Sequence, residues 1–329
     1  MLRGPAALGL RALASVAAGL VLSAQAARAH PAFEAGFAPL YGTVFTEGGN
    51  FSGSAMSAKL QALEPLLQRP GTAARDVFRL YYTQASVYGR RGMPEQAAQA
   101  ARAALAAMPK ASSEPQLAYA QFFLRYSSIR WLADSQQFDA ALQLVHAFQA
   151  EYPLPRIARL PAAMRWDPRS TPAQALDYPS QLQLLGIYED EGYVLHEQGK
   201  YREAQQANAR LLVVARERLQ ALGMPERLRG VLTNLAQNCY ELGELEQAGR
   251  YLQERLNIAL RAQGHATVYD SYFQLMVLSH EQGQSSQARR WLQAYEQHAL
   301  SQKDSEQQAR AKALQAELAT RPQPERTAL

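Results

Sequence analysis

The stretch YEDEGYVLHEQGKYREA, from Tyr188 to Ala204, contains an aromatic start, a small residue, a glycine at a turn and a closing alanine. Its segment His-Glu-Gln-Gly, ending at Gly199, returns as a second His-Glu-Gln-Gly that ends at Gly283. In both copies, apolar residues at helical spacing lie on either side of the glycine. This recurrence predicts a chain built from repeated helix-turn-helix units.

Three further copies extend the pattern, and the one with Gln136 at its turn is weaker. The five copies place their turns at Gly92, Gln136, Gly199, Gly243 and Gly283. Small residues are expected where paired helices approach closely, at Gly192, Ala204, Ala236 and Ala248. The second helix of the third copy is predicted to be long, over residues 201–222.

The pattern resembles the tetratricopeptide repeat family over about residues 75–300. The residues that carry the resemblance most clearly are Tyr188, Gly192, Leu195, Gly199, Tyr201 and Ala204. One departure is Glu191, which stands where the family has leucine. The resemblance implies an all-α fold, a right-handed α-solenoid of stacked helix-turn-helix repeats. The turns are spaced more widely than the family's usual repeat, so second helices or connections should be extended.

The other segments are assigned by composition. Residues 30–53 hold glycines and scattered aromatics without a helical period, which predicts an irregular arm. Residues 54–153 and 181–300 are expected to form two sets of repeats, the first opening with a helix over 54–67. Prolines in 154–180 forbid a continuous helix and predict an insertion that acts as a hinge or a partner-contacting loop. Residues 301–329 should form a capping helix and a tail.

The amino terminus has the features of an export signal. Basic residues precede an apolar run, and Ala27-Arg28-Ala29 forms a small-residue cleavage site. We therefore expect residues 1–29 to be a signal peptide and the protein to be periplasmic or secreted in a bacterium. The alternative is retention as a membrane anchor, although the apolar run is shorter than the roughly 20 residues that a spanning helix needs.

The charge balance excludes some partner classes. The chain of 329 residues has a formal net charge of +5, and three of its arginines lie in the expected leader. The remainder is close to neutral with interspersed charges, so we expect no attraction to nucleic acid or to an anionic membrane surface. After signal cleavage we also expect no membrane span. The single cysteine, Cys239, cannot form an internal disulfide and is expected in the core.

No motif points to catalysis, a cofactor or a metal. The pairs His196-Glu197 and His280-Glu281 lack the spacing that places two imidazoles on one helical face. A histidine near a helix carboxyl terminus is favoured by the helix dipole without any ligand. We therefore expect no catalytic residues, no cofactor and no metal ligands.

The resemblance implies that first-helix residues at fixed distances before each turn line a concave groove for a protein or peptide. These candidates are Tyr82, Tyr126, Arg130, Glu189, Tyr193, His196, Gln237, Tyr240, Phe273 and His280. Neighbouring positions suggest a groove that is basic at one end, through Arg79 and Arg90, and acidic at the other, through Glu197, Glu241 and Glu281. Solvated helix faces carry charges in any case, so the polarity has a plain alternative.

Three functional hypotheses follow. The first is an exported, non-catalytic scaffold that holds a protein or peptide segment along its inner face. The second is an accessory of an envelope machine for polysaccharide or peptidoglycan assembly or export, with glycan bound by the tyrosines. The third is an enzyme whose site lies in the proline-rich insertion or the amino-terminal arm, although neither segment is long enough to enclose a site alone.

Overall fold

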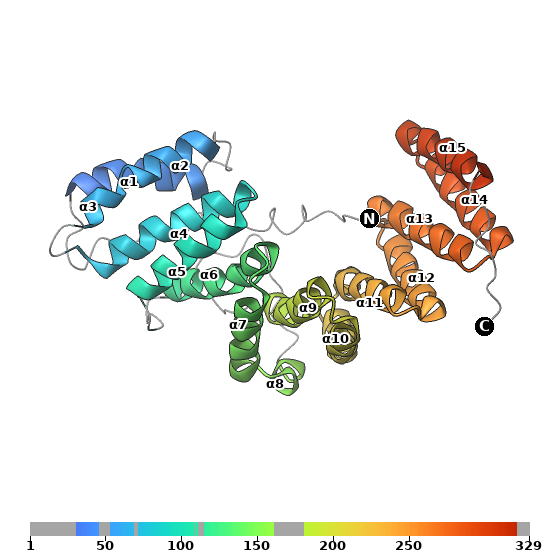
Figure 1. Ribbon diagram of the computed structural model, residues 1–329, viewed down its shortest axis with the longest axis horizontal. Helices are drawn as coiled ribbons and strands as arrows, with labels where there is room; N and C mark the ends of the chain where they lie inside the picture. Colours follow the sequence, from blue (N-terminus) through green and yellow to red (C-terminus); the bar gives the residue numbers. More distant parts are fainter. Residues whose placement is uncertain are drawn as a thin grey trace. The chain divides into compact units, whose positions relative to one another are not determined.

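The computed structural model describes residues 31–45, 53–68, 72–108, 110, 115–160 and 181–320. Over these ranges the chain forms helices and turns and contains no strand (Figure 1). The expected signal peptide and the expected tail, residues 322–329, lie outside the described residues. Of the segment expected as an insertion, only residues 154–160 are described, and they begin with the short helix α8.

The chain divides into two compact units. The first comprises Met1–Pro153 and Met164–Asp190, and the second comprises Leu154–Ala163 and Glu191–Leu329. Helices of the first unit are α1 (Pro31–Phe45), α2 (Gly53–Gln61), α3 (Glu64–Leu67), α4 (Ala74–Arg90), α5 (Pro94–Ala107), α6 (Pro115–Asp134) and α7 (Phe138–Glu151). The boundary falls within α9 (Gln181–Glu197). Helices of the second unit are α8 (Leu154–Ala158), α10 (Tyr201–Ala221), the 3₁₀ helix η4 (Pro225–Leu228), α11 (Arg229–Glu241), α12 (Leu245–Arg261), α13 (His265–Glu281), α14 (Ser285–Ser301) and α15 (Ser305–Thr320).

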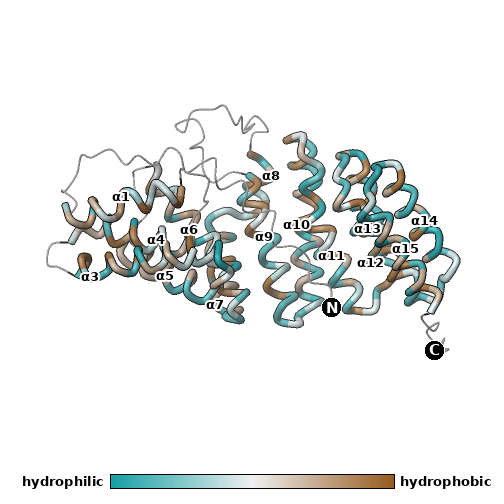
Figure 2. Tube along the Cα trace, turned by 90° about the horizontal axis from the view of Figure 1, so that it is seen from above, coloured by the Kyte–Doolittle hydropathy of each residue, from teal (hydrophilic) through white to brown (hydrophobic). Residues whose placement is uncertain are grey.

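Helices that follow one another in the sequence pack against one another. In the first unit α4, α5, α6 and α7 do so in order, and in the second unit α10 to α15 do so in order. Brown and teal alternate along these helices in Figure 2, as expected for helices that each bury one side. Neighbouring helices thus share a hydrophobic layer, as the repeat pattern predicts.

The five predicted turns are confirmed by backbone geometry. Gly92, Gly199, Gly243 and Gly283 have φ values of 66°, 75°, 73° and 70°, and Gln136 has 61°. In each turn the next residue donates its N–H to a carbonyl in the last turn of the helix, as Lys200 does to Leu195 at 2.9 Å. This closes a Schellman motif, which ends the helix and reverses the chain.

Close approach between helices explains the small residues. Ala204, Ala236 and Ala248 are buried as predicted, and so is Cys239. Gly192 packs against Asn208 of α10, and a Cβ at Gly192 would overlap the Asn208 amide group. The predicted long helix is α10, and the helix predicted at the start of 301–329 is α15.

The prediction of an irregular arm over 30–53 is wrong for residues 31–45, which form α1. Phe33, Phe37, Tyr41 and Phe45 recur every fourth residue, and neighbouring rings in this series lie 4.8–5.6 Å apart. They form one stripe that packs against α4, where the Phe45 ring lies 5.3 Å from that of Tyr82. This burial outweighs the helix-breaking tendency of Pro39, which lies inside α1.

The helix predicted over 54–67 is interrupted. It splits into α2 and α3, with turns at Ala62 and Leu63. Pro65 has no N–H to donate to the carbonyl one turn earlier, so the α-helical hydrogen bonding stops there. The apolar spacing predicts helix correctly on both sides of the break, and Pro65 interrupts its continuity.

Replacing Gln136 with glycine should stabilise the first unit. Gln136 adopts the left-handed conformation that glycine supplies at the corresponding turns. Because a side chain is strained there, Gln136→Gly should raise the free energy of unfolding by about 0.5–1 kcal/mol. Urea unfolding checks this, with Gln137→Gly as control, since Gln137 has a φ of −89°. Equal effects at both positions would contradict the interpretation.

Candidate functional site

The ten predicted groove residues lie on the first helices of the hairpins, α4, α6, α9, α11 and α13. Tyr82 on α4 is only 6% exposed. Its ring stacks on Phe45 and Phe78 at 5.3 and 5.9 Å and meets the edge of Phe123 at 6.3 Å. The prediction that Tyr82 lines an open groove is therefore corrected, because this ring belongs to the aromatic core of the first unit.

Three predicted residues of the first unit, Tyr126 and Arg130 on α6 and Glu189 on α9, lie close enough to interact electrostatically. Arg130 Nε donates to Asp190 Oδ1, whose carboxylate is buried. Burial raises the pKa of Asp190, and the guanidinium of Arg130 opposes that rise. Burial followed by the charge of Asp190 raises the pKa of Tyr126. The group is an ion pair that ties α6 to α9, because a buried carboxylate needs its partner.

The second unit links its first helices by one polar or ring contact at each step. His196 Nδ1 donates to Asn238 Oδ1 at 2.7 Å, which joins α9 to α11. Tyr240 Oη donates to Glu281 Oε1 at 3.0 Å, which joins α11 to α13. The guanidinium of Arg310 lies 5.4 Å from the ring centroid of Phe273, which joins α13 to α15.

Exposure separates the residues that a partner can reach from those that it cannot. His280 is 9% exposed, so its side chain is buried, contrary to the expectation that it lines the groove. Tyr240 is 41% exposed, and no other Phe, Tyr or Trp among the described residues is exposed. Tyr193, His196, Gln237 and Phe273 are half-buried. We call the accessible set the first-helix face of the second unit; its residues are Tyr193, His196, Gln237, Tyr240, Phe273 and Glu281.

The charge at the edge of this face is acidic. Glu197, Glu241 and Glu281 each lie two residues before a turn glycine, and all three are exposed. The recurrence places a carboxylate at the same point of three successive hairpins. Because these side chains reach water, they contribute a local negative potential that salt screens.

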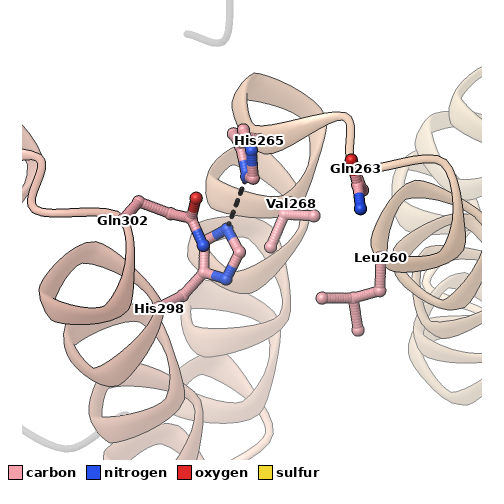
Figure 3. A pocket seen from close by; sticks show the side chains of 6 residues that line it. All are labelled: Leu260, Gln263, His265, Val268, His298 and Gln302. Carbon is pink, nitrogen blue, oxygen red and sulfur yellow. Dashed lines mark hydrogen bonds between the residues drawn. The ribbon is translucent and has the colours of Figure 1, made fainter.

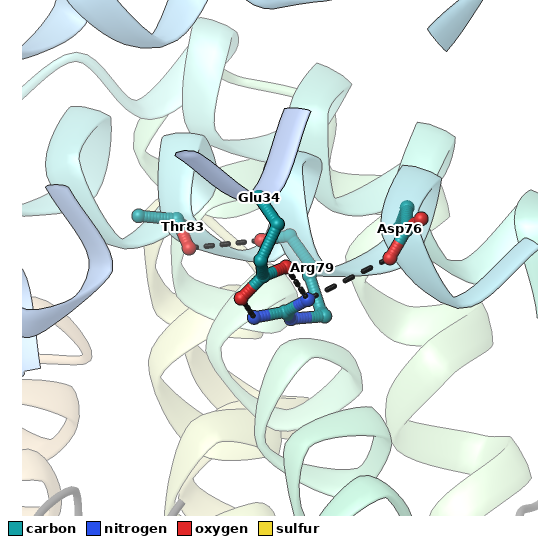
Figure 4. Close-up of polar contacts among 4 residues, drawn as sticks. All are labelled: Glu34, Asp76, Arg79 and Thr83. Atoms are coloured by element: carbon teal, nitrogen blue, oxygen red, sulfur yellow. Dashed lines mark hydrogen bonds and ion pairs between the residues drawn. The ribbon is translucent and has the colours of Figure 1, made fainter. Parts of the chain in front are cut away.

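The predicted basic end of the groove is wrong. Arg79 donates to both carboxylate oxygens of Glu34, at 2.7 and 3.1 Å, and also lies near Asp76 (Figure 4). Its side chain is 13% exposed. Arg90 donates to the carbonyl of Val44 at 2.9 Å. Both arginines hold α1 on α4, and the sequence did not reveal this because α1 was not expected as a helix.

The described residues contain no group of three or more His, Cys, Asp or Glu side chains with metal-binding geometry. Cys239 is buried, and burial raises the pKa of its thiol, which keeps the sulfur protonated and unreactive at neutral pH. None of the described helices combines the length and apolar character required to cross a bilayer.

Sequence reasoning missed the partners of the predicted residues. Asn238 and Asp190 are buried polar side chains on first helices, each paired with a predicted residue. A polar residue at an otherwise apolar inward position was the available signal. Arg310 is exposed on the terminal helix α15, and the sequence pattern does not distinguish it from the other charged residues of that helix.

No protein-family model matches this chain, and a search of curated protein sequences finds no significant match.

Proposed function

We propose that this protein is an exported, non-catalytic scaffold of the tetratricopeptide type. Within the second unit, its first-helix face binds an extended protein segment. The proposal assigns the protein to the periplasm or the exterior of a bacterial cell, on the basis of the leader-like residues 1–29. The partner is held in position, and no step of chemistry is required of the scaffold.

Contacts between successive hairpins of the second unit support a stacked, solenoid-like arrangement there. First helices touch first helices through His196–Asn238 and Tyr240–Glu281. Second helices touch second helices through Arg216, which donates to both carboxylate oxygens of Glu254 at 3.1 and 2.6 Å. In a stack of hairpins, first helices pack beside first helices and second helices beside second helices. The first helices therefore form one continuous surface.

Tyr240 is the observation on which the binding assignment rests. Its ring is 41% exposed, while its hydroxyl is held by Glu281 of the next first helix. The ring is thus fixed in one orientation and loses little conformational freedom when a partner covers it. Exposed, preorganised aromatic side chains are typical anchors of protein–protein interfaces.

The exposed carboxylates at the edge of the first-helix face indicate which side chains a bound peptide should carry. With Glu197, Glu241 and Glu281 exposed beside the aromatic and amide groups of the face, a basic side chain flanked by apolar residues is complementary. An extended peptide presents alternate side chains to such a surface, one set to the face and one to solvent. We therefore expect the bound segment to be extended, basic and partly apolar.

Selection from a displayed library of random peptides tests the proposal. The chain without residues 1–29 should enrich peptides that contain Lys or Arg next to apolar residues. Tyr240→Ser should weaken a selected peptide by about 2 kcal/mol, or roughly thirtyfold, because an anchoring ring is lost. Tyr240→Phe, which removes only the hydroxyl held by Glu281, should have a smaller effect. Raising the salt concentration should weaken binding by the wild type.

The control is Val213→Ser, an equally apolar-to-polar change at a side chain of α10 that is 71% exposed. It should leave peptide affinity unchanged. Peptides that bind Tyr240→Ser as tightly as wild type would overturn the assignment of the first-helix face. Co-sedimentation with cell-wall glycan that depends on Tyr240, without peptide enrichment, would overturn the peptide proposal in favour of glycan binding.

A further inference from the structure

Two histidines meet at one end of the hairpin formed by α13 and α14. His265 begins α13, and His298 lies in the last turn of α14. Their rings are joined by a hydrogen bond between His265 Nδ1 and His298 Nε2 at 3.2 Å (Figure 3). Neither residue belongs to the first-helix face or to the repeated His-Glu-Gln-Gly segments.

A cavity of about 270 Å³ opens beside this pair. It is lined by Leu260, Gln263, His265, Val268, His298 and Gln302. None of these side chains is a lysine or an arginine, so no fixed positive charge opposes a cation at the rings. Gln302 follows His298 by one helical turn, and its amide group lies beside the imidazoles in Figure 3.

We propose that His265 and His298 form a bidentate site for a divalent transition-metal ion such as Zn²⁺, with water completing the coordination. Imidazole nitrogens bind Zn²⁺ at about 2.0–2.1 Å, so two of them on one tetrahedral ion lie roughly 3.3 Å apart. The 3.2 Å separation already matches that requirement. The ligand pair is preorganised because the two rings come from helices that are packed against each other.

The surroundings hold His298 in place and favour its neutral form. Its ring lies against Tyr269 at 5.1 Å and Tyr272 at 6.4 Å. Burial, followed by the proximity of His265, lowers the pKa of His298. A metal ligand must be unprotonated, so this environment favours the form that binds. His265 is exposed, which leaves a path for the ion from solvent.

The site takes imidazole-seeking ions rather than calcium or magnesium, which prefer oxygen ligands. Two protein ligands leave positions open for water or for a group from another molecule. A metal ion bound by both histidines would crosslink the start of α13 to the end of α14. Since it binds only the folded hairpin, it would stabilise the second unit in proportion to its concentration.

Calorimetric titration of the chelator-treated chain without residues 1–29 with Zn²⁺ tests the proposal. In a non-coordinating buffer near neutral pH, one equivalent should bind. His265→Ala should weaken this binding by at least about tenfold, as expected for loss of a metal-site residue. His265→Cys, which supplies a thiolate at the same position, should retain binding. Binding should also weaken as the pH falls below the histidine range, because protons compete for the ligands.

His146→Gln is the matched control, since His146 is an exposed histidine on α7 of the first unit. It should leave Zn²⁺ affinity unchanged. Zn²⁺ should also raise the thermal midpoint of wild type but not that of His265→Ala, a readout that is independent of the calorimetry. Absence of Zn²⁺ binding, or equal affinity in wild type and His265→Ala, would overturn the proposal.

Discussion

Replacing Gly192 with alanine is expected to destabilise the second unit by about 3 kcal/mol, the upper range for forcing an extra methyl group into a packed interior. The added Cβ would overlap the side-chain amide of Asn208, including its central carbon. Asn208 is fully buried and donates to the carbonyl of Ala204 at 3.0 Å, so it has no free space to move into. Urea unfolding of the purified chain, monitored by circular dichroism, measures the loss.

Gly199→Ala separates the effect of packing from that of backbone conformation. Gly199 lies in the same hairpin, but a Cβ there would meet nothing within 4 Å, and only its φ of 75° disfavours a side chain. We expect a loss of about 1 kcal/mol from that strain alone. Asn208→Ala should rescue Gly192→Ala but not Gly199→Ala, with a coupling energy of about 1 kcal/mol or more between positions 192 and 208. Additive effects of Gly192→Ala and Asn208→Ala would refute the close contact.

Phe37→Ala should cost about 3–5 kcal/mol, as expected for truncation of a buried aromatic side chain. The Phe37 ring is fully buried. It stacks on Phe33 at 5.0 Å, and the guanidinium of Arg79 lies 4.8 Å from its centroid. Its removal breaks the aromatic stripe of α1 at the centre, so α1 should separate from α4. Denaturant unfolding measures the cost, and amide hydrogen exchange over residues 31–45 reports the separation.

Ala38→Ser is the control for the α1 prediction. Ala38 is exposed on the same helix, one residue from Phe37, so the change alters helix propensity but no buried contact. Its effect should stay within about 0.5 kcal/mol, as for most surface substitutions. Slow exchange over residues 31–45 in Phe37→Ala would show that α1 is held in some other way.

The turns were predictable because their chemistry is local. A glycine after an apolar helical run supplies a positive φ at no steric cost, and the Schellman motif needs only the residues next to it. Gln136 was found by its place in the pattern despite being a poor residue for that conformation. The turns at Gln263 and Lys303 were not predicted, because non-glycine residues there give no local signal.

Helix α1 was not predicted because the contacts that stabilise it are not local. Glycines at 36 and 42 and a proline at 39 argue against a helix when only propensity is considered. Its stability comes from the ring stripe against α4 and from the pairing of Glu34 with Arg79. Those contacts join residues that are distant in the sequence, and tertiary packing routinely overrides weak local preference.

In the candidate site too, the sequence pattern predicts the positions along the helices but not which side chains are exposed. Counting back from each turn located the helix positions, since the rotation of a helix is regular. It did not reveal that Tyr82 and His280 are buried while Tyr240 is exposed. Burial at equivalent positions depends on the side chains of the neighbouring helices. Those side chains differ from repeat to repeat, and the repeat pattern does not describe them.

Helix identity, chain reversals and the order of the hairpins follow from the amino-acid pattern, because each depends on residues within one or two helical turns. The pairing of Arg79 with Glu34, of Arg130 with Asp190 and of His265 with His298 is decided by folding in three dimensions. Each of these contacts joins different helices. Their geometry is set by how closely the helices pack, which is a property of the whole hydrophobic layer between them.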